Sequence, residues 1–262
     1  MYNFFAKLQN FLEASTDHST SDHTIAEYIL RHVSDIPNMT IYELAEACHL
    51  SPATISRFCR RFESISFKEL KEHASEFNDF NRTEIHQGPE SDMIVGLPDY
   101  FEQVKKSLAQ TEKLLQEDIL QQAAILMHDA NKLSFFGVTF SNVVAKNAQI
   151  KFMRLGKHTA SYSNHENQII EANAMIPDDL AIVISSSGDT RFIVKLTKEL
   201  SRNEVPILAI TSNPDSYLGQ HAKLVIQISG QKMDGYKSPI LEEINMQAAV
   251  NMLYLHYSGR YN

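Results

Sequence analysis

Cysteine and long hydrophobic runs are scarce in this chain of 262 residues. Its two cysteines, Cys48 and Cys59, are too few for a disulfide framework, so we expect small buried thiols in a reducing compartment. No apolar stretch approaches the roughly 18–20 residues that a helix needs to span a bilayer. The segment from Met1 to Leu12 has one lysine and no apolar run of the kind found in secretory signals. These absences predict a cytoplasmic protein without a membrane partner.

Positive charge is not in excess either, because the formal net charge is −8. This balance argues against a protein that coats nucleic acid with a broadly basic surface, but it is compatible with a local basic helix on an acidic dimer. The eleven histidines are scattered, and the sequence contains neither an HExxH nor a CxxC motif. We interpret His158 and His165 as ordinary surface or packing residues, and we expect neither a metal site nor a cofactor.

Apolar periodicity divides the chain into two parts. In residues 1–80 the apolar positions recur at helical spacing, which predicts several short helices. Residues 81–98 lose this spacing and include Gly88 and Pro89, so we predict a linker there. Further on, helical segments alternate with apolar strand patterns, expected near residues 133–137, 158–162, 180–185, 205–211 and 223–228. The prediction is an all-α domain over 1–80 and an α/β domain over 99–262, with a doubly wound, mainly parallel sheet flanked by helices.

Residues 41–62 have the spacing of two short helices joined by a tight turn. Thr40 and Glu43 form a capping-box pattern for the first helix, and His49 lies where the chain must turn sharply. Ser51 is an N-cap residue, and Pro52 suits the first position of the second helix. The buried stripe of this second helix is predicted to comprise Ile55, Phe58, Cys59 and Phe62.

The outer faces of the second helix carry small polar and basic side chains and no acid. Such a helix fits the DNA major groove, where arginines contact phosphates or guanine and hydroxyls contact base edges or phosphates. The predicted DNA-binding residues are Ser51, Ala53, Thr54, Ser56, Arg57, Arg60 and Arg61. The alternative is a plain helical hairpin with a solvated basic face.

Hydroxyl-bearing residues follow two of the predicted strands. The apolar run 180–184 ends in serines and Gly188, and a helix begins directly afterwards. Strand ends and helix N-termini offer backbone N–H groups to anions, and hydroxyls add neutral donors. The predicted phosphate-binding residues are Ser141, Ser185, Ser186, Ser187, Gly188 and Thr190. Alternatively, these hydroxyls only cap two helices. With no Walker lysine and no dinucleotide fingerprint, we expect a small phosphorylated metabolite and not ATP or NAD.

The two-helix segment and the hydroxyl-rich loop after residue 184 resemble those of the RpiR/MurR family of bacterial transcriptional regulators. These proteins join an N-terminal helix–turn–helix domain to a C-terminal sugar isomerase (SIS) domain. The similar segments are 44–47, 50–58 and 67–71, together with 185–190, which matches the Ser-x-Ser-Gly-x-Thr phosphate loop. The resemblance implies sugar-phosphate sensing, assembly through the SIS domain as a homodimer or a dimer of dimers, and binding to a palindromic double-stranded DNA operator.

Two positions depart from the family pattern. Glu63 stands where the family has glycine after the recognition helix, followed by Ser64 and Ile65. Thr139 replaces the second glycine of a Gly-x-Gly-x-Ser turn, and its side chain is expected to intrude where the backbone would approach a ligand.

Three functions are compatible with these patterns. The first is a transcriptional regulator that senses a phosphorylated sugar and is not an enzyme. The second is a sugar-phosphate isomerase with a helical appendage, for which Glu166, Glu242 or Glu243 would serve as general base. The third is a regulator whose ligand site has decayed. We favour the first, because acids such as Glu242 and Glu243 at a helix start also stabilise the helix dipole.

Overall fold

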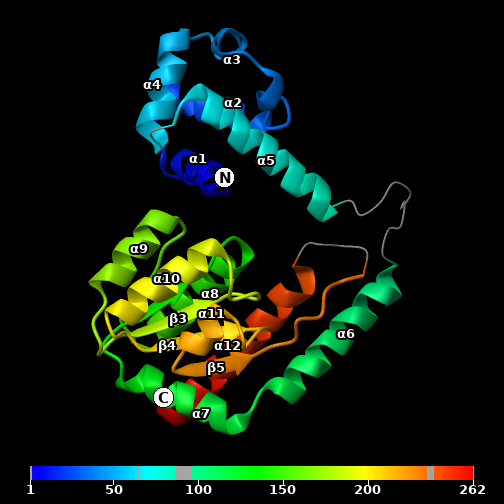
Figure 1. The fold of residues 1–262 in the computed structure, drawn as a ribbon, viewed down its shortest axis with the longest axis vertical. Coiled ribbons are helices and arrows are strands. Elements are labelled where there is room, and N and C mark those ends of the chain that lie inside the picture. The colour runs from blue at the N-terminus through cyan, green and yellow to red at the C-terminus, as the bar shows by residue number, and fades with distance from the viewer. Residues whose placement is uncertain (1, 64, 86–95, 235–238, 262) are drawn as a thin grey trace. The chain divides into compact units, whose positions relative to one another are not determined.

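The computed structural model describes residues 2–63, 65–85, 96–234 and 239–261 (Figure 1). The chain forms two compact units, residues 1–87 and residues 88–262. Each unit has its own hydrophobic core.

The first unit is helical. Its elements are α1 (Tyr2–Ala14), α2 (Ser21–Arg31), the 3₁₀ turn η1 (Ile36–Asn38), α3 (Ile41–Ala47), α4 (Pro52–Glu63) and α5 (Phe67–Ile85). Phe4 of α1, Ile25 of α2, Leu44 of α3, Phe58 of α4 and Leu70 of α5 are all fully buried in one core. Helix α5 continues to Ile85, five residues into the range predicted as a linker.

The second unit is an α/β domain. Its helices are α6 (Leu97–Leu114), α7 (Glu117–Asp129), α8 (Phe140–Arg154), α9 (His165–Ala174), α10 (Arg191–Arg202), α11 (Tyr217–His221) and α12 (Ile240–Tyr261). Its strands are β1 (Leu133–Phe136), β2 (Thr159–Ser161), β3 (Leu180–Ile184), β4 (Ile207–Thr211) and β5 (Leu224–Gln227). All five predicted strands are present, and α11 is an element that the sequence pattern did not predict.

The five strands form one parallel sheet in the order β2-β1-β3-β4-β5. Helices cover both of its faces (Figure 1). Phe135, Ile182 and Leu208 pack against α7, α8 and α12, whereas their neighbours Phe136 and Val183 pack against α9 and α10. Burial on both faces explains why the strands are continuous apolar runs and not alternating ones. The prediction of a doubly wound parallel sheet is confirmed.

The strand order reverses direction between β1 and β3. From β1 the chain crosses to β2 at one edge, whereas β3 is followed by β4 and β5 toward the other edge. Phe136 pairs with Val183, so the two strands end side by side. In open α/β sheets, ligands bind outside the carboxyl ends of the strands at such a switch point. The turns after β1 and β3 are the two segments that the sequence predicted to bind phosphate.

Candidate functional site

The turn between α3 and α4 has a defined hydrogen-bond pattern. The His49 N–H donates to the Glu46 carbonyl at 2.9 Å, and the Leu50 N–H donates to the Ala45 carbonyl at 2.8 Å. These two bonds make a Schellman motif, which places its central residue in the left-handed region. His49 has φ +55°, so the predicted sharp turn at this residue is confirmed.

Helix α4 begins and packs as its sequence predicts. Ser51 Oγ accepts a hydrogen bond from the Thr54 N–H at 3.1 Å, and Pro52 is the first helical residue. The predicted inner stripe is buried, with Ile55, Phe58 and Cys59 fully covered. The capping box of α3 is also present, since the Thr40 N–H donates to Glu43 Oε2 at 2.7 Å.

The outer face of α4 is accessible. Ser51, Ala53, Arg57, Arg60 and Arg61 are exposed, and Thr54 and Ser56 are half-buried. The Thr54 hydroxyl already has two local hydrogen-bond partners. It accepts from Arg57 Nη2 at 3.4 Å and lies 2.9 Å from Ser51 Oγ. Arg60 makes no ion pair with any residue that the structure describes.

An acidic side chain from another helix joins this basic face. Asp22, in the first turn of α2, forms an ion pair with Arg61. The two residues lie 39 positions apart in the chain, so the absence of acids between Ser51 and Phe62 did not reveal this pair. Around them lies a surface hollow of about 590 Å³, which is also lined by Ser21, Thr54, Arg57 and Arg60. Arg61 is therefore a partly neutralised cation, whereas Arg57 and Arg60 keep their full charge.

The loop after β3 is folded around Gly188. This residue has φ +68°, and a Cβ atom built on it would lie 2.6 Å from Ser216 Cβ. The buried Ser185 closes the turn, because its Oγ accepts a hydrogen bond from the Gly188 N–H at 3.2 Å. The Ser185 hydroxyl keeps its own proton to donate, so this role in the turn is compatible with phosphate binding.

The remaining hydroxyls of the loop differ in their surroundings. Ser186 Oγ lies 3.0 Å from Ser212 Oγ, which follows β4. Ser187 and Thr190 are exposed, and within the described residues their hydroxyls have no hydrogen-bond partner. Thr190 is also the N-cap of α10. A helix start supplies backbone N–H groups without intrahelical partners and the positive end of the helix dipole. Ser187, Thr190 and the start of α10 therefore form the most accessible candidate site for an anion in this loop.

Asp189 carries the loop's only negative charge and points to a different partner. Its Oδ1 accepts a hydrogen bond from the Tyr217 N–H at 2.7 Å, at the start of α11. Neither Asp189 nor Ser216 was singled out from the sequence. A comparable signal existed for Ser216, because β4 also ends in hydroxyl-bearing residues: Thr211 is its last residue, Ser212 follows directly, and Ser216 precedes α11.

The turn after β1 is held by a buried glutamine. Gln168 of α9 accepts from the Gly137 N–H at 3.3 Å and donates Nε2–H to the Gly137 carbonyl at 3.0 Å. A Cβ atom on Gly137 would lie 2.6 Å from the Ser141 carbonyl oxygen, so a side chain does not fit there. Ser141 is half-buried at the start of α8, and its hydroxyl donates to the Met246 sulfur at 3.5 Å.

Thr139 occupies a backbone conformation suited to glycine. Its φ of +51° and ψ of −120° are costly for a β-branched residue, on the order of 1–3 kcal/mol. The side chain is exposed. Glycine at this position of the family pattern is expected to leave space for a ligand. The positive φ of Thr139 is a second reason for glycine there, because glycine adopts this conformation without strain.

The three candidate bases lie at helix starts. Glu166 is in the first turn of α9, and Glu242 and Glu243 are in the first turn of α12. Glu243 is half-buried, whereas Glu242 is only 4% exposed and its Oε2 has no hydrogen-bond partner among the described residues. Burial raises the pKa of the Glu242 carboxyl.

The remaining titratable groups do not form a metal or thiol site in the described part of the chain. Burial raises the pKa of both Cys48 and Cys59 to about 11, so their thiols stay protonated at neutral pH. Within the described ranges no three His, Cys, Asp or Glu side chains converge on a metal position. The ring of His165 stacks on Phe192, with 3.9 Å between centroids. No helix of the described residues is long and apolar enough to cross a membrane.

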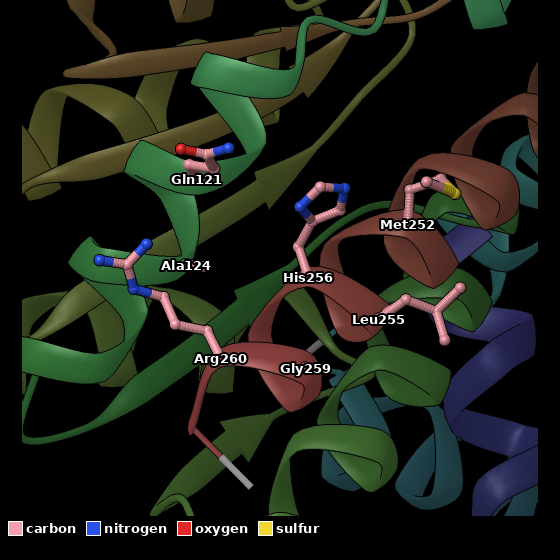
Figure 2. A pocket seen from close by; sticks show the side chains of 7 residues that line it. All are labelled: Gln121, Ala124, Met252, Leu255, His256, Gly259 and Arg260. Atoms are coloured by element: carbon pink, nitrogen blue, oxygen red, sulfur yellow. The ribbon is translucent and has the colours of Figure 1, made fainter.

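A groove of about 410 Å³ lies between α7 and α12 (Figure 2). Gln121 and Ala124 line it from α7, and Met252, Leu255, His256, Gly259 and Arg260 line it from α12. Met252 is about 15 Å along the helix from Glu242, at 1.5 Å per residue. The groove is therefore remote from the carboxyl edge of the sheet and separate from the phosphate-binding candidate.

These features define a class of protein. A helix–turn–helix unit is joined in one chain to a parallel α/β unit whose switch point carries two turns rich in neutral donors. The helix-turn-helix domain of the rpiR family matches residues 3–77, and the SIS domain matches residues 126–257. The chain belongs to the RpiR family of helix–turn–helix transcriptional regulators that carry a SIS domain.

Individual relatives agree with this assignment. An uncharacterized HTH-type transcriptional regulator of Caldanaerobacter subterraneus subsp. tengcongensis is 27% identical over 245 residues, covering 93% of this chain and 87% of that protein. HexR of Pseudomonas aeruginosa is 28% identical over 218 residues, covering 81% and 74% of the two chains. The Vibrio vulnificus NanR protein complexed with ManNAc-6P shares the fold, with a TM-score of 0.59 at 20% identity over 99% of this chain and 92% of that chain.

Proposed function

We propose that this protein is a DNA-binding regulator whose SIS domain senses a phosphorylated sugar and thereby modulates operator binding. The observation that carries the proposal is the placement of two donor-rich turns on the adjacent ends of β1 and β3. The NanR structure, which contains ManNAc-6P, supports a phosphosugar as the class of effector. We place its action in the cytoplasm, where a bacterial operator lies.

The proposal assigns roles to the two parts of the chain. Residues 1–80 would bind DNA, residues 81–98 would link the units, and residues 99–262 would bind the effector. The DNA contacts would come from Ser51, Ala53, Thr54, Ser56, Arg57, Arg60 and Arg61. The phosphate contacts would come from Ser141, Ser185, Ser186, Ser187, Gly188 and Thr190. The exposure of the three arginines on α4, and of Ser187 and Thr190 at the carboxyl edge of the sheet, supports these roles.

Replacing the two exposed hydroxyls of the loop after β3 (residues 185–190, the serine loop) is expected to weaken effector binding. In Ser187→Ala with Thr190→Ala, each lost hydrogen bond to the phosphate removes about 1.5–3 kcal/mol, or roughly 10–100-fold in affinity. The measurement is a thermal-shift panel of sugar phosphates, in which one compound stabilises the wild type and not the variant. Ser201→Ala, at the exposed end of α10, is the control. A panel in which no compound stabilises the wild type contradicts the proposal, as does conversion of the bound sugar to its isomer, which would favour the isomerase.

The SIS unit also offers a surface for a second copy. Helices α8 and α12 lie side by side, since Gln247 Nε2 donates to Asn147 Oδ1 at 3.1 Å. Their outer surfaces expose five large apolar side chains, Val143, Ile150, Met153, Met252 and Leu255. Exposed apolar patches of this kind mark interaction sites. A palindromic operator requires two recognition helices about one DNA turn apart, so we propose a symmetric dimer through this surface.

Charged residues on this surface are expected to dissociate the dimer. In Ile150→Asp with Leu255→Asp, two carboxylates would face their symmetry copies in an apolar interface. Sedimentation velocity at micromolar concentration should give a dimer for the wild type and a monomer for the variant. Ile170→Asp is the matched control, because Ile170 is 59% exposed on α9, at the other face of the sheet. A monomeric wild type, or a variant that remains dimeric, contradicts the assignment.

A further inference from the structure

The SIS unit contains a buried carboxyl group, that of Glu242, with one unpaired oxygen. Glu242 is 4% exposed, and its Oε2 accepts no hydrogen bond from the described residues. A buried carboxyl oxygen without a donor is unfavourable, so such groups are rare unless they serve a function. Burial is the main cause of the raised pKa of this carboxyl, and a hydrogen bond from its own backbone N–H and the charge of Lys232 partly offset it.

The neighbouring buried polar residue of α12 is fully paired. Asn245 is completely buried, accepts from Thr111 Oγ1 at 2.8 Å and donates to Ser107 Oγ at 2.6 Å. The helix thus pairs one buried polar side chain with residues of α6, whereas one turn earlier the Oε2 atom of Glu242 stays unpaired. Glu242 is therefore not part of the polar network that joins α12 to α6.

Position along α12 places Glu242 at the ligand edge of the sheet. Residues i and i+4 share a helix face, so Glu242 lies one turn before Met246 on the same side. The Met246 sulfur is the atom that accepts from the Ser141 hydroxyl. Ser141 follows β1 at the switch point. The start of α12 is therefore about one helical turn from the residue that contacts Ser141, and burial puts Glu242 on the core-facing side of the helix.

We propose that Glu242 recognises the carbohydrate part of the effector by accepting hydrogen bonds from its hydroxyl groups. This inference rests on the proposed sugar-phosphate sensing and adds to it the residue that selects the sugar. The donors of the serine loop suit an anion, whereas a carboxylate repels phosphate and pairs with hydroxyl protons. The effector class is therefore a polyhydroxylated phosphate ester, bound at one end by donors and at the other by an acceptor.

The test measures ligand-free stability and ligand binding in the same variants. Glu242→Gln removes the charge, and Glu242→Met removes the polarity at similar volume. Both are expected to raise the melting temperature of the ligand-free protein by about 2–4 °C, because the cost of burying a carboxyl group with an unpaired oxygen is removed. Both should weaken binding of the hexose phosphate that stabilises the wild type, on the order of 10–100-fold, and leave the small effect of inorganic phosphate unchanged. Glu243→Gln, at the half-buried adjacent residue, should change neither quantity.

The outcomes separate this inference from the function on which it rests. A lower melting temperature in both Glu242 variants would show that the carboxylate stabilises the fold, and this would overturn the inference. Variants with raised stability and unchanged hexose phosphate affinity would also overturn it, while sugar-phosphate sensing itself would stand. If glucose 6-phosphate, fructose 6-phosphate, glucosamine 6-phosphate and N-acetylmannosamine 6-phosphate all fail to stabilise the wild type, both proposals fail together.

Discussion

Replacing both Arg57 and Arg60 by alanine is expected to lower operator affinity by on the order of 100-fold or more at 0.15 M salt. Both side chains are exposed on α4, outside its buried stripe, so the fold of the first unit should be unaffected. If both arginines contact phosphates, the slope of log affinity against log salt should become shallower by about 2. If one reads guanine, the slope should change by less and selectivity for one base pair should fall.

The measurement is fluorescence anisotropy with a duplex selected from a random library, over a series of salt concentrations. Lys68→Ala is the control, because Lys68 lies on α5 and pairs with Glu72. Arg61→Ala should lower operator affinity less than the single variants Arg57→Ala and Arg60→Ala, since Asp22 already offsets the charge of Arg61. Unchanged affinity in the double variant would leave α4 as part of a plain helical hairpin.

Introducing a methyl group at Gly188 is expected to destabilise the SIS unit by about 2–5 kcal/mol. Left-handed backbone costs a non-glycine residue about 1–2 kcal/mol, and overpacking against Ser216 adds about 1–3 kcal/mol. At roughly 2–4 °C per kcal/mol, the melting temperature should fall by about 4–20 °C. Because the same contact shapes the serine loop, effector stabilisation should be lost as well.

Gly156 provides a matched control for this substitution. Its φ is +80°, similar to that of Gly188, but no atom lies within 4 Å of the position of its Cβ. Gly156→Ala should therefore show the backbone cost alone, about 1–2 kcal/mol. Differential scanning calorimetry of both variants separates the two contributions. Equal losses in Gly156→Ala and Gly188→Ala would mean that the contact with Ser216 has no role in the loop.

The local features of the fold were predictable because each depends on residues a few positions apart. The capping box of Thr40 and Glu43 joins a residue to the one three positions on, and the turn at His49 follows from its place between two helical patterns. The parallel sheet was equally accessible, since strands buried on both faces are continuous apolar runs. Helix α11 was missed because its five residues include Gly219 and are too few to show a helical period.

By itself the sequence determined the two-part organisation, the parallel sheet, the two helices joined by a tight turn at His49, and the strand ends that carry hydroxyls. Only the tertiary structure decided what those groups meet: Asp22 pairs with Arg61, Gln168 holds Gly137, Asp189 binds the start of α11, and Glu242 is buried with one unpaired carboxyl oxygen. The reason is physical. Periodicity and capping report which side of an element is buried, whereas the partner of a buried or charged group comes from an element that is distant in sequence and is fixed by packing.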